Sequence, residues 1–272
     1  MIEYVLWLAL GMMILSAIIP NSRFFRKLIG ALGWVFFGIH WAYQPLHYLE
    51  IHDYFNVVLT IVVAIFCFFF AYTMADEYRR RNFALESIDV TSMVTGVAAI
   101  GSLFYFPFLQ MESLNYWIIS TVTDNVVQVL HMLGYPVDST WNTISLNGYS
   151  VEIILACTAI ESIALFIGLI TSVKAPMKRV ASSFMVSVPV IYVLNIFRDV
   201  FVVIAYTQQW FGPSSFEIAH HVIAKFGSMI ALFVIGYAVL RILPELFDLI
   251  DGVYELVTIW MRNIAEKFSG IR

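Results

Sequence analysis

The residues best suited to chemistry in this chain are one cysteine, one arginine and two histidines on three separate apolar runs. Cys157 lies near the start of the run from Glu152 to Val173, Arg198 lies in the next run, and His220 and His221 open the last one. A thiol becomes a good nucleophile when a cation or a base favours the thiolate, and a histidine can take the thiol proton and return it to a leaving amine. A guanidinium can stabilise the thiolate or the oxyanion of a tetrahedral intermediate, or bind a carboxylate or a lipid phosphate. The set predicts acyl transfer through a thioester.

Two further ionisable residues belong to the same runs and are secondary candidates. Glu161 follows Cys157 by one helical turn, which predicts the thiol and the carboxylate on one helix face. Lys225 lies one turn beyond His221. Each also has a structural interpretation, because Glu161 could neutralise Arg198 or Lys225, and a lysine near a span end can extend its ammonium group to the surface. The third catalytic group therefore stays open among the two histidines and Lys225.

The other polar residues of the set have structural alternatives as well. Arg198 could pair with the adjacent Asp199, although a charge inside a membrane is costly and indicates function by default. The two histidines could be interfacial residues at the end of a span. Cys67, in IFCFFF, has no polar neighbours and is interpreted as a small buried apolar residue.

The composition excludes an ordinary soluble domain. Apolar residues make up 61% of the chain and charged residues 12%, whereas charged residues are about a quarter of a typical soluble domain. The two cysteines lie on separate apolar runs, and no basic tract suggests nucleic acid, so neither a disulfide framework nor a nucleic-acid partner is predicted. No cofactor or metal site is predicted either, because four histidines show no ligand-like spacing: His40, His47, His52 and His131.

The apolar runs predict an all-α polytopic membrane protein with about seven transmembrane helices. Seven runs reach spanning length: Ile2 to Pro20, Leu28 to Tyr48, Tyr54 to Ala75, Val90 to Leu109, Glu152 to Val173, Val180 to Tyr206 and Phe216 to Leu243. We therefore expect residues 1–243 to form the membrane domain.

The distribution of cations predicts the orientation. Of the 15 lysines and arginines, all except Arg198 and Lys225 lie in three alternate connections, at the very end of the last run (Arg241) or after it. The intervening connections contain none, and cytoplasmic loops carry the excess of cations. The rule places the N-terminus outside the cell membrane and the C-terminus in the cytoplasm.

Two segments outside the spans have recognisable patterns. The first half of residues 110–151 is apolar at near-helical spacing, and its second half carries Asn147 and Gly148 between alternating runs, which is a strong hairpin signal. We expect an extracytoplasmic cap, consisting of a helix and a β-hairpin, that covers the site of Cys157. Residues 244–272 place apolar side chains on one stripe, which predicts an amphipathic helix on the cytoplasmic surface.

This topology predicts a common depth for the candidate residues. Cys157 lies less than two turns from the outer end of its run, at about 1.5 Å per residue. Arg198 falls in the outer half of its run, and His220 and His221 begin the last run at its outer end. We therefore expect the active site near the outer face of the membrane.

Three short segments resemble the exosortase and archaeosortase family. They are ACTAIES around Cys157, NIFRDV around Arg198 and AHHVIAKFGS around His220 and His221. The resemblance covers residues 152–236, which we expect to be the catalytic core. It implies a transpeptidase with Cys157 as the acyl-forming nucleophile, Arg198 as proton donor or stabilising group, and His221 as the third group, with His220 or Lys225 as rivals.

The same resemblance implies the partners. Substrates would be exported or surface proteins whose C-terminal signal combines a short motif, a hydrophobic helix and a basic tail. In one branch of the family the motif is Pro-Gly-Phe, and the new C-terminus is joined to a membrane lipid.

Two other functions fit parts of the pattern. An intramembrane cysteine protease would hydrolyse its substrate without transfer, and would leave a free C-terminal carboxylate. A non-enzymatic anion or lipid transporter would use Arg198 and Lys225 for binding, but it predicts charges nearer the midplane and repeated halves, neither of which the sequence contains.

Overall fold

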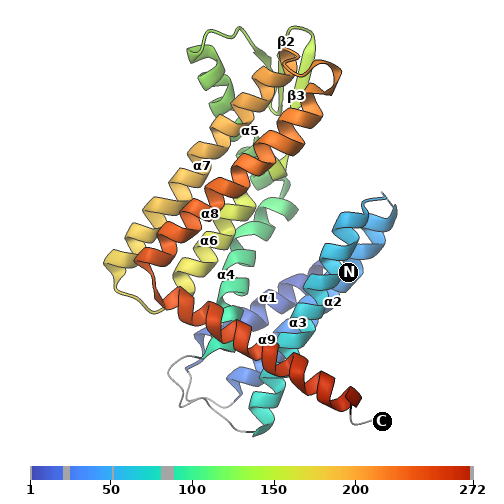
Figure 1. The fold of residues 1–272 in the computed structure, drawn as a ribbon, viewed down its shortest axis with the longest axis vertical. Helices are drawn as coiled ribbons and strands as arrows, with labels where there is room; N and C mark the ends of the chain where they lie inside the picture. Colours follow the sequence, from blue (N-terminus) through green and yellow to red (C-terminus); the bar gives the residue numbers. More distant parts are fainter. Residues whose placement is uncertain (1, 21–24, 51, 81–88, 270–272) are drawn as a thin grey trace. The chain divides into compact units, whose positions relative to one another are not determined.

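The computed structural model describes residues 2–20, 25–50, 52–80 and 89–269, and it is mainly helical (Figure 1). Two compact units make up the chain: residues 1–100 together with 245–272, and residues 101–244. Arg23, Arg81 and Arg272, three of the cations behind the predicted orientation, lie outside the described residues. The orientation therefore remains a prediction.

The first unit contains the N-terminal helices and the C-terminal one. Its elements are α1 (Ile2–Ile18), α2 (Arg26–Glu50), α3 (Tyr54–Arg80), the first half of α4 (Val90–Gln110) and α9 (Glu245–Ser269). The helix predicted after residue 244 is thus present as α9, while its place on the cytoplasmic surface remains a prediction. Cys67 is buried in α3 with 1% of its surface exposed.

A buried ion cluster connects α2, α3 and the start of α4 within this unit. The Nζ atom of Lys27 lies 2.7 Å from Oε2 of Glu77 and 2.5 Å from Oδ1 of Asp89. Burial raises the pKa of the Asp89 carboxyl, but the Lys27 charge and hydrogen bonds from Lys27 and Ser92 bring that pKa below its ordinary value. Breaking such a buried pair leaves an uncompensated charge. Lys27 therefore has a structural role within this unit, in addition to its place among the cations that predict the orientation of the chain in the membrane.

The second unit contains the cap and the three candidate runs. Its elements after α4 are α5 (Glu112–Met132), β1 (Asp138–Ser139), β2 (Thr143–Leu146), β3 (Tyr149–Glu152), η1 (Leu155–Cys157), α6 (Ile160–Ser172), α7 (Met177–Thr207), η2 (Gly212–Ser214), η3 (Glu217–Ala224) and α8 (Lys225–Ile242). The helix α7 packs against both α6 and α8. The segment η3 is a π-helix that continues directly into α8.

The predicted hairpin is present. The strands β2 and β3 are antiparallel with Leu146 opposite Tyr149, so Asn147 and Gly148 form the two-residue turn. Their φ angles are 55° and 80°, as a type I′ turn requires. The strand β1 was not predicted, because two residues are too short to show alternation.

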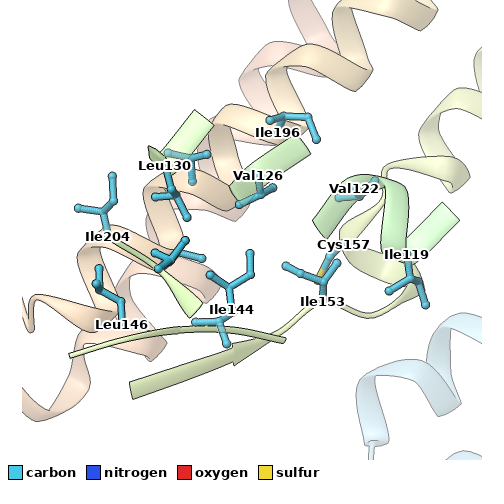
Figure 2. Packing of buried hydrophobic residues seen from close by; sticks show 14 of the residues in the cluster. Ile119, Val122, Val126, Leu130, Ile144, Leu146, Ile153, Cys157, Ile196 and Ile204 are labelled. Carbon is cyan, nitrogen blue, oxygen red and sulfur yellow. The ribbon is translucent and has the colours of Figure 1, made fainter. Parts of the chain in front are cut away.

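The sheet and α5 enclose an apolar core (Figure 2). Val122, Val126 and Leu130 on one face of α5 are fully buried, as is Ile144 from β2. Residues from α7 complete the cluster, which also contains Cys157. The cap is therefore packed onto the thiol-bearing segment, while its extracytoplasmic location remains a prediction.

The interpretation of Glu152 to Val173 as one continuous helix is wrong. The strand β3 extends to Glu152, and the backbone N–H of Ile153 still donates to the Asn142 carbonyl at 2.7 Å, so this stretch is held by the sheet. Helix α6 begins only at Ile160, after Ala159 in the left-handed region with φ 58°. Cys157 and Glu161 therefore do not share a helix face, since a short 3-10 turn and a break separate them.

The number of spans is supported only in part. Among the described residues, four helices are long and apolar enough to cross a membrane: Tyr54–Arg80, Val90–Gln110, Met177–Thr207 and Glu217–Ile242. The helices α1 and α6 are apolar but shorter, and α2 carries polar residues along its length. A helical membrane protein is established, and the count of seven remains a prediction.

The turn geometry makes a test of the hairpin possible. Gly148→Ala should destabilise the protein by about 1–2 kcal/mol, because an L-residue in the left-handed region carries that penalty. Asn147→Gly is the matched control and should be tolerated, since glycine adopts a φ of 55° freely. Thermal unfolding of both variants in detergent measures the difference, and equal stability would contradict the assigned turn.

Candidate functional site

A cavity of about 400 Å³ lies where the three candidate runs meet. Ala156 and Ala159 line it beside the thiol-bearing turn, residues 191–201 line it from α7, and residues 223–235 line it from η3 and α8. Its ionisable lining side chains are Glu161 and Arg198, and most of the remaining wall is apolar. The structure thus brings together the cysteine segment, the arginine helix and the helix that follows the histidines.

Cys157 borders this cavity without lining it. Its side chain is buried, with 9% of the residue exposed, and it packs in the apolar core near Ile119, Val122 and Ile153 (Figure 2). Among the residues that the structure describes, no hydrogen bond or ion pair joins the sulfur to Arg198 or to either candidate histidine. The thiol is therefore next to the cavity wall but turned toward the core.

One amide side chain connects the cysteine segment to the arginine. Asn195 Nδ2 donates to the Cys157 carbonyl oxygen at 2.6 Å and to Asp199 Oδ2 at 3.1 Å, and Arg198 Nη1 donates to Asn195 Oδ1 at 3.0 Å. Asn195 is 6% exposed, and its bonds to Cys157 and Asp199 are buried, while the bond from Arg198 is partly buried. This side chain fixes the positions of the η1 backbone and of the guanidinium relative to each other.

Arg198 also has the predicted partner Asp199. Its Nε atom lies 3.8 Å from Oδ1 of Asp199, and the side chains are 20% and 4% exposed. The pairing supports the structural interpretation of Arg198, but it leaves part of the guanidinium at the cavity. A guanidinium carries five N–H donors, and the hydrogen bond to Asn195 uses one of them.

The backbone around the thiol provides a second source of positive potential. Helix α6 begins at Ile160, immediately after the left-handed Ala159, and the Ile163 N–H donates to the Ala159 carbonyl as the first helical bond. The N–H groups of a first helical turn have no partner within their own helix, and together with the helix dipole they favour an anion. A thiolate or an oxyanion beside the cavity would be stabilised by them.

The histidines lie in η3, just before the residues of η3 and α8 that line the cavity, but they do not line it themselves. The half-buried His220 stacks on Phe216 with ring centroids 5.2 Å apart, and His221 is exposed and contacts His220 edge-on at 4.8 Å. Arg198 lies within electrostatic range of His220. Both histidines belong to the π-helical segment η3, a type of irregularity frequent at functional sites.

The two secondary candidates, the acidic Glu161 and the basic Lys225, lie in different surroundings. Glu161 lines the cavity and accepts a hydrogen bond from the Tyr105 hydroxyl at 3.1 Å, and the interpretation that it neutralises Arg198 or Lys225 remains a prediction. Lys225 is exposed at the start of α8, one residue beyond the lining residue Ala224. Glu161 is therefore closer to the candidate chemistry than Lys225.

Sequence reasoning missed Asn195. The signal was available, since Asn195 is an amide in an apolar run and precedes Arg198 by three residues, on the same helix face. Its bond to the Cys157 carbonyl could not be inferred, because that contact depends on how the turn before α6 folds.

The environment of Cys157, which precedes α6, acts on its acidity in opposing ways. Burial raises the pKa of the thiol above its ordinary value, and the Asp199 charge raises it further. A backbone hydrogen bond at Ile154 and the Arg198 charge lower it, but the net direction is upward. The thiol in this arrangement is protonated near neutral pH, so a base or a changed environment is needed to form the thiolate.

Comparisons with known proteins identify relatives that match most of the chain. A family model described as transmembrane exosortase matches residues 2–240. Archaeosortase A of Haloferax volcanii is 26% identical over 289 aligned residues, covering 93% of this chain and 92% of that protein. Archaeosortase A of Natronomonas pharaonis is 25% identical, covering 86% of this chain and 81% of its own. No solved structure matches the chain.

The opposing charges predict opposite shifts in thiol reactivity. In a Cys67→Ser background, which leaves Cys157 as the single thiol, Arg198→Gln should raise the pH midpoint of Cys157 alkylation, because the cation favours the thiolate. Asp199→Asn should lower it, because the carboxylate disfavours the thiolate. The rate of alkylation by a small neutral reagent is measured as a function of pH. Limited access of the reagent to the buried thiol changes the rate by the same factor at every pH, so it does not move the pH midpoint. Shifts in the same direction would contradict the electrostatic assignment.

Proposed function

The chain belongs to the transmembrane exosortase family, and on this premise we propose that it is a membrane cysteine transpeptidase acting through a thioester at Cys157. Its archaeosortase relatives support a role in processing the sorting signals of exported proteins. The observation that carries the proposal is the cavity bordered by the cysteine turn and lined by Arg198, among the three segments that resemble the family: the turn before α6, α7, and η3 with α8.

The first half of the reaction forms the acyl-enzyme. A histidine takes the Cys157 proton, and the thiolate sulfur attacks the scissile carbonyl carbon, so that a C–S bond forms and the carbonyl becomes an oxyanion. The Arg198 guanidinium and the first-turn N–H groups of α6 stabilise that charge. The C–N bond then breaks, and the histidine returns the proton to the leaving amine.

The second half transfers the acyl group. An amine of the acceptor attacks the thioester carbonyl, a new C–N bond forms and the C–S bond breaks. The proton lost by the amine passes through the histidine to the departing sulfur, which restores the thiol. Water in place of the amine would give hydrolysis, so a site that excludes water favours transfer.

Attack requires the thiol to turn from the apolar core toward the cavity. Cys157 lies in a three-residue 3-10 turn, and Ala159 two residues later has a φ of 58°, which costs a non-glycine residue energy. Such strain clusters at active sites, and catalytic contacts in unliganded enzymes are often completed only on substrate binding. The short distance in sequence between the thiol and the cavity-lining Ala156 and Ala159 keeps that movement small.

The proposed substrates and location follow from the family and the topology. The substrate is an exported protein with a C-terminal signal of Pro-Gly-Phe type, a hydrophobic helix and a basic tail, and the acceptor is a membrane lipid. A substrate tail that spans the membrane with its cations inside presents its cleavage motif at the outer face. The proposed active site lies at that face, with the N-terminus outside and the C-terminus in the cytoplasm.

Two readouts separate this proposal from its alternatives. Mass spectrometry of the processed C-terminus distinguishes transfer from hydrolysis, because hydrolysis leaves a free carboxylate. Flux into liposomes that persists without Cys157 would instead favour a transporter.

Replacing the nucleophile gives the most direct prediction. Cys157→Ala should lower processing of a signal-bearing substrate by about a thousandfold or more, because loss of a nucleophile removes the covalent route. Cys67→Ala is the matched control, since it removes a second buried cysteine and should leave processing intact. Processing is followed by gel mobility of the substrate in membranes, and normal processing by Cys157→Ala would exclude the thioester mechanism.

The two histidines can be separated by single substitutions. The resemblance assigns the third role to His221, whereas electrostatic proximity to Arg198 favours His220. We expect His220→Gln to slow processing by about 10²–10⁴-fold, the usual contribution of a general acid-base group, and His221→Gln to have the smaller effect. The reverse order would return the role to His221, and small effects of both would remove histidine from the mechanism.

A further inference from the structure

The cavity beside Cys157 is long and narrow. Its α7 wall extends over residues 191–201 and its η3 and α8 wall over residues 223–235. At about 1.5 Å per residue, these walls are about 15–18 Å long. A volume of about 400 Å³ open to the centres of water-sized molecules, spread over such a length, gives a width of about 5–6 Å for those centres. Adding the water radius of about 1.4 Å on each side gives about 8 Å between the walls.

This width discriminates between the two kinds of apolar occupant that a membrane offers. An α-helix with side chains is about 10–12 Å across, so it is wider than this space. Carbon atoms pack about 4 Å apart, so a single hydrocarbon chain fits a channel of this width. The dimensions therefore select a hydrocarbon chain over a peptide helix.

The two ends of the cavity differ in polarity. Arg198 and Glu161 lie at the end next to the cysteine turn, and Leu232 and Ile235 lie toward the other end. Small residues along α8, including Gly227 and Ala231, leave the space between these ends open. A guanidinium binds phosphate through paired hydrogen bonds. A molecule with a phosphate head and an apolar chain matches this arrangement in length and width, and its phosphate matches the charge of Arg198.

We propose that this cavity holds one hydrocarbon chain of a phospholipid, with the phosphate at Arg198 and the rest of the head group beside the turn that carries Cys157. The inference deepens the proposed function, on which it rests for the role of the lipid as acceptor. The chain anchors the lipid, and the head group is thereby presented to an acyl group carried on the thiol.

Photolabelling tests the binding site independently of activity. The probe is phosphatidylethanolamine with a diazirine midway along one chain, incorporated into phosphatidylethanolamine vesicles that contain the full chain. Labelled peptides are mapped by mass spectrometry. We expect label on α7 and α8 within residues 191–201 and 223–235, and the same label in Cys157→Ala, which cannot carry out the proposed chemistry.

Two glycines of α8 provide matched variants. Gly227 lines the cavity and Gly236 does not, and a Cβ atom added at either would meet nothing within 4 Å. Gly227→Leu should reduce labelling of these segments by about tenfold or more, because it fills the space the chain needs. Gly236→Leu should keep the label. Gly227→Ala and Gly236→Ala serve as folding controls, since alanine favours a helix interior over glycine.

Each outcome bears on the proposal separately from the enzyme assignment. The lipid site is overturned if these segments carry no label. It is also overturned if both leucine variants are labelled equally while the alanine variants are as stable as the unaltered protein. Label of the same segments by a diazirine-bearing hydrophobic peptide, with none from the lipid, would assign the cavity to the substrate instead. Loss of processing in Cys157→Ala with the label retained leaves the lipid site intact, and a lipid site in a protein without processing activity would overturn only the proposed function.

Discussion

The arrangement of the candidate site depends on the hydrogen bonds of one buried amide. Asn195 donates to the Cys157 carbonyl and to Asp199, and it accepts from Arg198. In apolar surroundings an unsatisfied polar group is expensive, so these bonds are strongly maintained. The backbone of the cysteine turn and the guanidinium on α7 are consequently held in fixed positions relative to each other. Among the described residues, the cysteine side chain itself makes no polar contact with the arginine.

The cap determines where the thiol lies. The hairpin and α5 form an apolar core with α7, and Cys157 belongs to that core. Because β3 runs to Glu152 and Ile153 is still bonded to Asn142, the chain reaches the cysteine in an extended and turning form rather than as a helix. The core thus keeps the thiol buried and protonated, while the neighbouring alanines open onto the cavity. A buried, protonated thiol is a poor nucleophile, so the proposed reaction requires these surroundings to change.

The two long walls of the cavity, α7 and α8, contribute different kinds of residues to it. The helix α7 contributes both the polar network and part of the apolar lining, whereas α8 contributes small residues that leave room beside it. Gly101 of α4 meets the Ala164 carbonyl of α6 so closely that an added Cβ would lie 3.2 Å from it, so α6 is held from its other side as well. Close packing by small residues is the usual way in which membrane helices approach each other. The groups at the mouth of the cavity are therefore presented by well-packed elements.

The sequence by itself determined the membrane class, the hairpin and the family-like segments that carry the cysteine, the arginine and the histidines. Each of these is encoded locally, since apolar runs, the Asn147–Gly148 pair and ionisable residues in apolar surroundings can be recognised without knowing what they contact. Only the tertiary structure decided that α6 starts at Ile160, that Glu161 bonds to Tyr105 and that Asn195 holds the cysteine turn. These features depend on contacts between residues distant in the sequence: the pairing of the sheet shortens the helix, and the packing of α4, α6 and α7 selects the partner of each polar side chain. Periodicity reports which residues favour a helix, but it carries no information on where a neighbouring strand will compete for the same backbone.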